Sequence, residues 1–190
     1  VRYFEARFDP ARGPASGDGS EARVAAMDAA HEAVLDALAG VRSLAEDQVL
    51  RGLLDLMHET VRTSYYLGHD RISFKLDSAK VGSMPETRPL YEIAVSSRLV
   101  EGTHLRGGKV ARGGIRWSDR SDDFRTEVLG LMKTQMTKNA VIVPVGSKGG
   151  FVLKAPPADR DALRPHVQEQ YQTYIRGLLD LTDNLVAGES

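Results

Sequence analysis

The chain has 190 residues, which is long enough for one domain with a sizeable hydrophobic core and a short lead-in. Its formal net charge of −1 gives no general attraction to nucleic acid or to a membrane surface, so we expect neither as a partner. The absence of cysteine excludes disulfides and thiolate chemistry, and it fits a cytoplasmic location. No apolar run approaches the length that spans a bilayer, and no signal peptide is recognisable.

The chain is expected to begin with an extended arm and a flexible connector, which together occupy residues 1–19. The arm is predicted over residues 1–10. Residues 10–20 are rich in Gly, Pro, Ala and Ser, a composition that is typical of a turn or connector.

Two helices follow, and we expect them to form a helical hairpin over residues 20–68. The first is an alanine-rich stretch over residues 20–39 that ends near Gly40. The second begins at the capping box Ser43-Leu-Ala-Glu46 and keeps apolar residues at helical spacing as far as Val61.

Strands dominate the pattern from residue 69 onward. Residues 71–76 alternate between apolar and polar side chains, and residues 90–96 and 98–105 predict one or two further strands. Residues 115–117 predict a short strand after two pairs of glycines. Residues 121–139 then predict a helix.

The last part of the chain predicts a strand, a turn, a second strand and a helix. Val141–Pro144 is a short β-branched run that is typical of a buried strand. Gly146–Gly150 predicts a turn, Phe151–Leu153 predicts a strand, and a final helix is expected from about Asp161 into the 180s. The whole order predicts an α/β fold, with a mixed β-sheet over residues 69–190 preceded by the α-helical hairpin.

Basic residues gather beside glycines in two places of this second region. Glycine lets the backbone approach a ligand closely, and neighbouring lysines and arginines offer cationic donors to an anion. This combination is typical of a site for a small carboxylate or phosphate. The candidate residues are Lys109, Arg112, Gly113, Gly114, Arg116, Lys138 and Lys148.

The helix predicted over residues 121–139 carries two lysines, and a helical wheel separates them. Phe124 and Leu131 lie on the apolar face, on which Lys138 also falls, whereas Lys133 points the opposite way. A lysine that faces inward at a helix C-terminus needs an anionic partner, and a bound carboxylate would serve. The alternative is that Lys138 caps the helix and extends into water.

Lys148 stands between glycines after the predicted buried strand, and two interpretations remain open. It is either a reactive lysine or, more simply, a solvated lysine on a hairpin. The chain contains neither the GxxxxGK[ST] spacing of a P-loop nor the GxGxxG of a dinucleotide site. The five histidines form no HExxH pair, so no metal site is expected.

Three long strings closely resemble the large bacterial NAD-specific glutamate dehydrogenases, which are distant relatives of the ordinary glutamate, leucine and phenylalanine dehydrogenases. The resemblance covers nearly the whole chain and is weakest over residues 13–40. Its main strings are GTHLRGGKVARGGIRWSDR at 102–120, FRTEVLGLM at 124–132 and KNAVIVPVGSKGGF at 138–151.

The resemblance implies roles for three basic positions. A lysine that follows Met-Thr in the ordinary enzymes binds the substrate carboxylate, and here it is Lys138, without the aromatic residue between. A lysine in the glycine-flanked turn assists chemistry at the amine carbon, and here it is Lys148. A third lysine stands directly before the Gly-Gly-(Leu/Ile)-Arg motif. Here that position is Arg112, with Lys109 three residues earlier, which leaves open the residue that contacts the distal carboxylate.

The implied function is the substrate-binding portion of an NAD-dependent enzyme that converts L-glutamate to 2-oxoglutarate and ammonia. The resemblance implies a homo-oligomer, and it places the catalytic aspartate and the NAD-binding Rossmann domain beyond Ser190, so we expect this chain alone to be inactive. Lys148, unprotonated, would activate a water molecule in the positive field of Arg112, Arg116 and Lys138. Two alternatives are a non-catalytic amino-acid-sensing module and an assembly domain.

Overall fold

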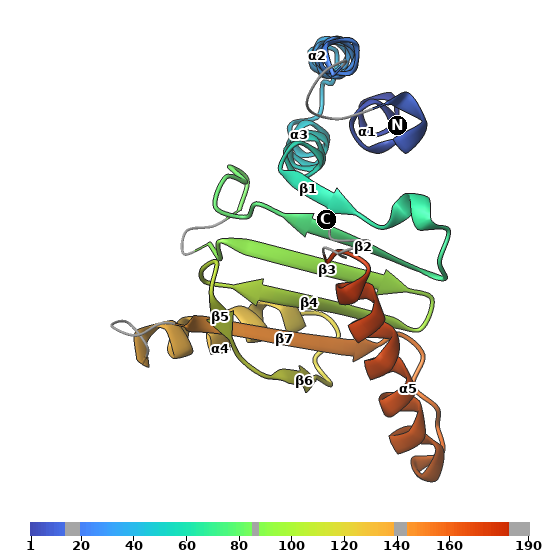
Figure 1. The fold of residues 1–190 in the computed structure, drawn as a ribbon, viewed down its shortest axis with the longest axis vertical. Coiled ribbons are helices and arrows are strands. Elements are labelled where there is room, and N and C mark those ends of the chain that lie inside the picture. The colour runs from blue at the N-terminus through green and yellow to red at the C-terminus, as the bar shows by residue number, and fades with distance from the viewer. Residues whose placement is uncertain (14–19, 85–87, 139–143, 183–190) are drawn as a thin grey trace, which may run out of the picture. The chain divides into compact units, whose positions relative to one another are not determined.

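Residues 1–13, 20–84, 88–138 and 144–182 are described by a computed structural model of the chain. They divide into two units, Val1–Glu59 and Thr60–Ser190, each with its own core. The first unit is helical, and the second contains the β-sheet (Figure 1).

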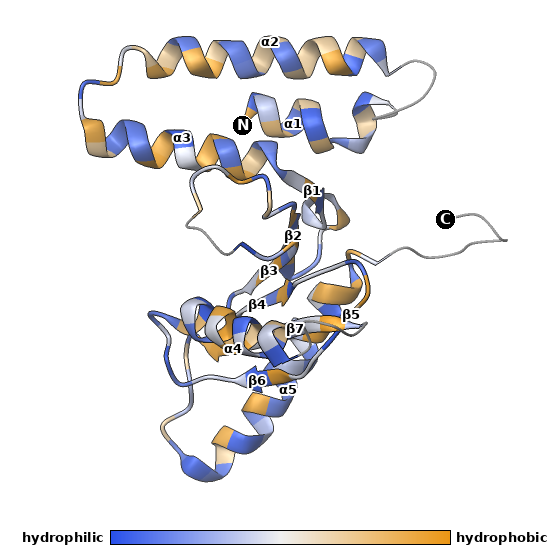
Figure 2. Ribbon diagram, turned by 90° about the vertical axis from the view of Figure 1, so that its left-hand side faces the viewer, coloured by the Kyte–Doolittle hydropathy of each residue, from blue (hydrophilic) through white to orange (hydrophobic). Residues whose placement is uncertain are grey.

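The first unit consists of three helices that lie alongside one another, α1 (Arg2–Phe8), α2 (Glu21–Leu38) and α3 (Leu44–His58) (Figure 2). Each helix contributes one buried residue to a shared core, Tyr3, Leu38 and Leu54. The Oγ of Ser43 accepts a 3.4 Å hydrogen bond from the Glu46 amide at the start of α3, as the capping box predicts. The two long helices of the predicted hairpin are therefore confirmed.

The prediction of an extended arm over residues 1–10 is wrong, because residues 2–8 form α1 and residues 10–12 form a 3₁₀ helix. Tyr3 and Ala6 lie three residues apart and are both buried, so one face of this short helix is covered. The guanidinium of Arg23, on α2, donates hydrogen bonds to the carbonyls of Arg7 and Gly13 and thereby holds the end of α1.

The predicted hairpin also ends earlier than expected. Helix α3 stops at His58, and Val61 lies in strand β1 (Thr60–Thr63), which belongs to the second unit. Residues 65–67 form a 3₁₀ helix. The β-branched residues of TVRT favour a strand, and β1 pairs antiparallel with β2 (Arg71–Leu76), so the extension of the hairpin to residue 68 is wrong.

The second unit contains a mixed seven-stranded sheet, which confirms the predicted fold class. Strands β1, β2, β3 (Tyr91–Ser97), β4 (Val100–Arg106) and β7 (Val145–Leu153) follow one another as antiparallel neighbours. Two short strands, β5 (Ala111–Arg112) and β6 (Ile115–Trp117), run parallel to β7 along its other edge. Strand β7 is therefore hydrogen-bonded on both sides.

Two helices cover opposite faces of the sheet, α4 (Phe124–Lys138) and α5 (Arg160–Leu179) (Figure 1). Neighbouring glycines of β7 show this directly. A Cβ on Gly150 would meet Val128 of α4, whereas a Cβ on Gly149 would lie 2.9 Å from the Tyr174 hydroxyl of α5. Successive residues of a strand point to opposite faces, so the two helices lie on opposite sides of β7.

The expected turn at Gly146–Gly150 is wrong, because these residues lie inside the continuous strand β7. Ser147 to Leu153 pair with Arg106 to Val100 without a break. The glycines serve close packing rather than chain reversal, since among the described residues positive φ occurs at Gly13 and Gly68 and not in β7. The strand expected at 141–144 falls largely on residues 141–143, outside the described residues.

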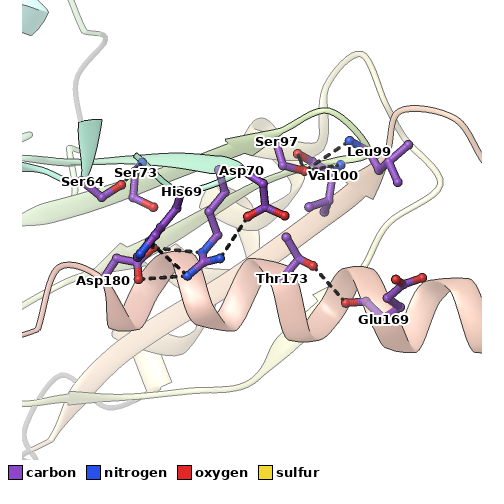
Figure 3. A network of polar contacts seen from close by, with 11 residues as sticks. Ser64, His69, Asp70, Ser73, Ser97, Leu99, Val100, Glu169, Thr173 and Asp180 are labelled. Carbon is purple, nitrogen blue, oxygen red and sulfur yellow. Dashed lines mark hydrogen bonds and ion pairs between the residues drawn. The ribbon is translucent and has the colours of Figure 1, made fainter. Parts of the chain in front are cut away.

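The C-terminal end of α5 is fixed to the sheet by a cluster of charged residues (Figure 3). The Asp180 carboxylate lies 2.9 Å from the Arg71 Nε and 3.3 Å from the His69 Nδ1. Arg71 also contacts Asp70 at 3.1 Å. Because Asp180 and Arg71 are mostly buried, this ion pair holds α5 across β2.

Candidate functional site

Lys148 lies on the face of β7 that α4 covers. It pairs with Leu105 of β4, and residues directly opposite in an antiparallel pair share a face. Leu105 is fully buried against Val128 and Met132 of α4, so this side of Lys148 is closed. Lys148 itself is half-buried, and the open side is the one next to β5 and β6.

That open side is formed by Gly113 and Gly114, the two residues that link β5 to β6 while the chain continues parallel to β7. Both glycines are exposed, and the Gly114 carbonyl accepts a 3.1 Å hydrogen bond from the Gly149 amide. Gly113 lies directly against the Ser147 carbonyl, where a Cβ would have no room. The glycine turn, residues 113–114, therefore runs immediately beside Lys148.

One side of α4 faces the glycine turn. Gln135 Nε2 donates a 3.1 Å hydrogen bond to the Arg112 carbonyl, and Glu127 Oε1 lies 3.1 Å from Arg116 Nη1. Lys138 belongs to the same side of the helix, since it follows Gln135 by three residues and Glu127 by eleven. It is exposed at the end of α4. The structure thus brings Lys138 to the same region as Arg112 and the glycine turn.

Lys133 belongs to the other side of α4. It is a helical neighbour of Leu129 and Met136, and a Cβ on Gly107 would lie 2.7 Å from the Met136 sulfur, which places this side toward the end of β4. The two lysines do lie on different sides of α4, but Lys133 is half-buried and Lys138 is exposed, so the prediction that Lys138 faces inward and Lys133 outward is wrong. The buried face of α4 is centred on Val128 and Met132, so the exposed Lys138 lies at its margin.

Arg112 and Arg116 differ in their surroundings. The exposed guanidinium of Arg112 has no carboxylate within ion-pair distance in the part of the chain that the structure describes. Arg116 is instead bound to Glu127, whose second oxygen accepts a 2.6 Å hydrogen bond from the Ser118 hydroxyl. Arg112 is consequently the freer cation for a ligand, and Arg116 ties β6 to α4.

A purely structural role for Arg112 would require an ion pair with an acidic residue of the chain, such as Asp119 or Asp123. Asp123 is bound by Arg120 instead, and this hydrogen bond holds the pKa of the Asp123 carboxyl below its ordinary value. Lys109 is exposed in the connection between β4 and β5, and its carbonyl accepts a 2.7 Å hydrogen bond from Arg106. The Lys109 side chain therefore stays available near the start of β7.

Gln135 was not singled out from the sequence as a site residue. Its Oε1 is buried and has no hydrogen-bond partner among the described residues, although its Nε2 is bound to Arg112. A buried acceptor without a donor is costly, so this atom is suited to a donor that a ligand brings. In the sequence, the indication of such a role is that Gln135 falls on the apolar face of the helical wheel, where a polar side chain needs a partner.

The opposite face of β7 carries a histidine that the sequence left unassigned. His104 pairs with Gly149, and a Cβ on that glycine would lie 3.1 Å from the imidazole ring. Burial lowers the pKa of His104 below its ordinary 6.5, and the nearby Arg106 adds to this shift. The neighbouring Tyr174 donates a 2.7 Å hydrogen bond to the Thr103 carbonyl, and burial raises the pKa of Tyr174.

The site as a whole is cationic. Arg112, Lys138, Lys148 and Lys109 lie around the glycine turn, and the carboxylate of Glu127 on α4 is taken up by Arg116 and Ser118. Such a site suits a small ligand with negatively charged groups. Among the described residues, no group of three or more His, Asp or Glu is placed to hold a metal ion. No helix in the described ranges is both long and apolar enough to cross a membrane.

Comparison with known proteins shows which family the chain is similar to. Residues 33–190 match the family model described as bacterial NAD-glutamate dehydrogenase, catalytic domain. The chain is 52% identical to an NAD-specific glutamate dehydrogenase of Halomonas elongata over its entire length, and 49% identical over 97% of its length to that of Mycobacterium tuberculosis. A more distant relative, the NAD-specific glutamate dehydrogenase of Neurospora crassa, is 28% identical over 72% of the chain.

The chain spans 12% of the length of the Halomonas and Mycobacterium relatives. The family match nevertheless covers both the sheet that carries Lys148 and the two helices that cover its faces. The chain therefore belongs to the bacterial NAD-glutamate dehydrogenase family, and residues 33–190 correspond to part of its catalytic domain.

Proposed function

We propose that this chain is the substrate-binding portion of an NAD-dependent glutamate dehydrogenase, which converts L-glutamate to 2-oxoglutarate and ammonia. The observation that carries the proposal is the position of Lys148, on a strand bonded on both sides and directly beside the exposed glycine turn. Membership of the family supports the same reaction.

The cations around the glycine turn match the two carboxylates of glutamate. Lys138 binds the α-carboxylate from the end of α4, and Arg112 grips the distal carboxylate through two parallel hydrogen bonds. The unpartnered Oε1 of Gln135 accepts a hydrogen bond from the substrate ammonium group. In this arrangement the α-carbon of the substrate lies near Lys148.

When bound by a part of the protein outside this chain, NAD would supply the acceptor for the hydride of the substrate α-carbon. Lys148 then removes a proton from the water molecule that attacks the resulting imine carbon, and it stabilises the oxyanion that develops there. Arg112 and Lys138 hold the two carboxylates throughout and keep the reacting carbon in place. Release of ammonia from this carbon gives 2-oxoglutarate.

The proposal is tested by replacing Lys148 with alanine in the complete polypeptide that carries this chain. Loss of a general acid–base group reduces kcat by about 10²-fold or more. Lys154→Ala is the matched control, because Lys154 directly follows the same strand at its other end and contacts Ser96 rather than the glycine turn. A Lys148→Ala enzyme with nearly normal kcat would contradict the assignment.

The same proposal assigns NAD binding to residues outside this chain, since the sequence contains no dinucleotide motif. We expect the isolated chain to be inactive and to show no saturable heat of binding with NAD in calorimetry. Micromolar binding by the isolated chain would reveal a cofactor site within it. A homo-oligomeric state and a cytoplasmic location of the complete protein belong to the proposal as well.

A further inference from the structure

A buried ion pair fixes the first turn of α4 to the middle of the sheet. Glu92, on β3, is only 3% exposed, yet it carries a carboxylate. Arg125 of α4 binds both of its oxygens, with Nε at 2.8 Å from Oε1 and Nη2 at 2.7 Å from Oε2. Thr103 donates a third hydrogen bond, of 3.0 Å, to Oε1. The hydrogen bonds that Arg125 donates to Glu92 raise the pKa of the guanidinium above its ordinary value.

A second ion pair, of opposite polarity, holds the other side of the same turn. Glu127 of α4 binds Arg116 of β6 at 3.1 Å and Ser118 at 2.6 Å. Residues 125 and 127 point about 160° apart on a helical wheel, because each residue advances the wheel by roughly 100°. The start of α4 is thus held from β3 on one side and from β6 on the other.

The far end of α4 has fewer such attachments among the described residues. Val128 and Met132, the buried residues of the helix, both lie before its last turn. Near the end, Gln135 binds the Arg112 carbonyl, and Lys138 is exposed. This end also packs on β7, since a Cβ on Gly146 would lie 3.1 Å from Gln135. The attachments at the start of the helix and this packing together set the position of the end over the glycine turn.

We propose that Glu92 and Arg125 are positioning residues for substrate binding, which hold α4 so that Gln135 and Lys138 lie over the glycine turn. This inference rests on the proposed function, in which Lys138 binds the substrate α-carboxylate. Lys138 lies about 20 Å along the helix from Arg125, so a tilt of roughly 3° at the first turn moves it by about 1 Å. A displacement of that size is enough to lengthen a charge-assisted hydrogen bond between Lys138 and a bound carboxylate well beyond its usual length of about 2.7–2.9 Å.

The test is Glu92→Gln in the complete polypeptide, with KM for glutamate and kcat measured separately. Loss of the bidentate pair is expected to raise KM by about tenfold while kcat changes by less than about threefold, because the ligand-binding end of α4 moves and Lys148 stays on β7. Arg125→Lys keeps the charge but loses the bidentate geometry, and it should raise KM in the same direction. This milder variant serves if Glu92→Gln fails to fold.

Asp180→Asn is the matched control, because it removes the buried carboxylate of another ion pair, that with Arg71, which holds α5 rather than α4. It should lower Tm as Glu92→Gln does and leave KM unchanged. A double variant tests whether the effect of Glu92→Gln acts through Lys138. In a Lys138→Ala background, Glu92→Gln should raise KM little further, because the group that Glu92 helps to position is gone. Glu92→Gln with lowered Tm and wild-type KM would overturn the inference.

Hydrogen exchange separates this inference from the proposed function. If the wild-type polypeptide does not oxidise glutamate with NAD, the proposed function fails, and the attachment of α4 is still measurable. Amides of residues 131–138 should then exchange faster in Glu92→Gln than in wild type, with no change in Asp180→Asn. Equal exchange of this segment in all three proteins would mean that Glu92 and Arg125 do not position the end of α4.

Discussion

Gly113 lies against Ser147 so closely that a Cβ on Gly113 would occupy the position of the Ser147 carbonyl oxygen. Its neighbour Gly114 has nothing within 4 Å of the corresponding position. Neither residue has the positive φ that favours glycine in turns. The requirement for glycine at position 113 is therefore one of close backbone approach, and it keeps the glycine turn beside Lys148.

This difference predicts opposite outcomes for two similar substitutions. Gly113→Ala forces β5 and β6 away from β7, and we expect Tm to fall by about 5 °C or more. Gly114→Ala meets open space and should change Tm by less than about 2 °C. Thermal unfolding of the two variants beside the wild type is the measurement, and equal losses would show that the turn relaxes without cost.

The two lysines of α4 are expected to differ in catalysis. Lys138→Ala should raise KM for glutamate while kcat stays close to wild type, because a group that binds substrate and transition state equally contributes uniform binding. Lys133→Ala is the control on the opposite side of the same helix and should leave KM unchanged. Steady-state kinetics of both variants shows which lysine binds the substrate carboxylate. A raised KM in Lys133→Ala and an unchanged KM in Lys138→Ala would place the carboxylate site on the other side of α4.

Arg112 is predicted to select dicarboxylic over apolar amino acids. We expect Arg112→Ala to abolish most of the discrimination between glutamate and norvaline. Its Tm should change little, since no described carboxylate pairs with the guanidinium. The comparison of kcat/KM for the two substrates tests this. If discrimination survives, Lys109 becomes the better candidate, and Lys109→Ala should then show the loss.

Because of His104, we expect the folded protein to be less stable against unfolding in mild acid than at neutral pH. Its pKa is lowered in the folded protein, so below pH 6.5 the unfolded chain binds a proton that the folded chain does not. The stabilisation is complete above about pH 6.5 and decreases as the pH falls toward the lowered pKa. His104→Gln should therefore reduce the difference in Tm between about pH 7.5 and pH 5.5, measured beside the wild type. If the dependence of Tm on pH is the same in His104→Gln as in the wild type, His104 is not the cause of the acid destabilisation.

Elements with strong local signals were predictable from the sequence. The alternation over residues 71–76 became β2, and the capping box at Ser43 became the start of α3. Such segments carry their own periodicity and end signals, so the surrounding structure reinforces what the local pattern indicates. The mixed sheet followed from the order of these elements.

Elements whose conformation depends on distant partners were not predictable. Gly146–Gly150 has the composition of a turn, but β4 pairs along it, and Val128 and Tyr174 occupy the space that side chains would fill. Residues 2–8 lacked a helical signal of their own and become helical where Tyr3 and Ala6 are buried against the neighbouring helices. Tertiary packing decides both cases, and a single sequence does not display it.

The candidate site was predictable as a set of residue types but not as an arrangement. Lys138, Lys148 and the glycines at 113–114 were identified from their pattern, and the structure brings them to one region. The separate roles of Arg112 and Arg116 were not visible, because they depend on Glu127 reaching across from α4. The free acceptor of Gln135 was missed for the same reason.

The position of Lys148 within a strand that is hydrogen-bonded along both edges has a thermodynamic consequence for binding. A lysine on a mobile loop must lose backbone freedom when its ligand arrives, and that conformational entropy is subtracted from the affinity. Lys148 loses this freedom when the sheet folds, with β4 on one side and the glycine turn and β6 on the other. Its backbone is therefore preorganised, and only the outer bonds of its side chain remain to be ordered by a ligand.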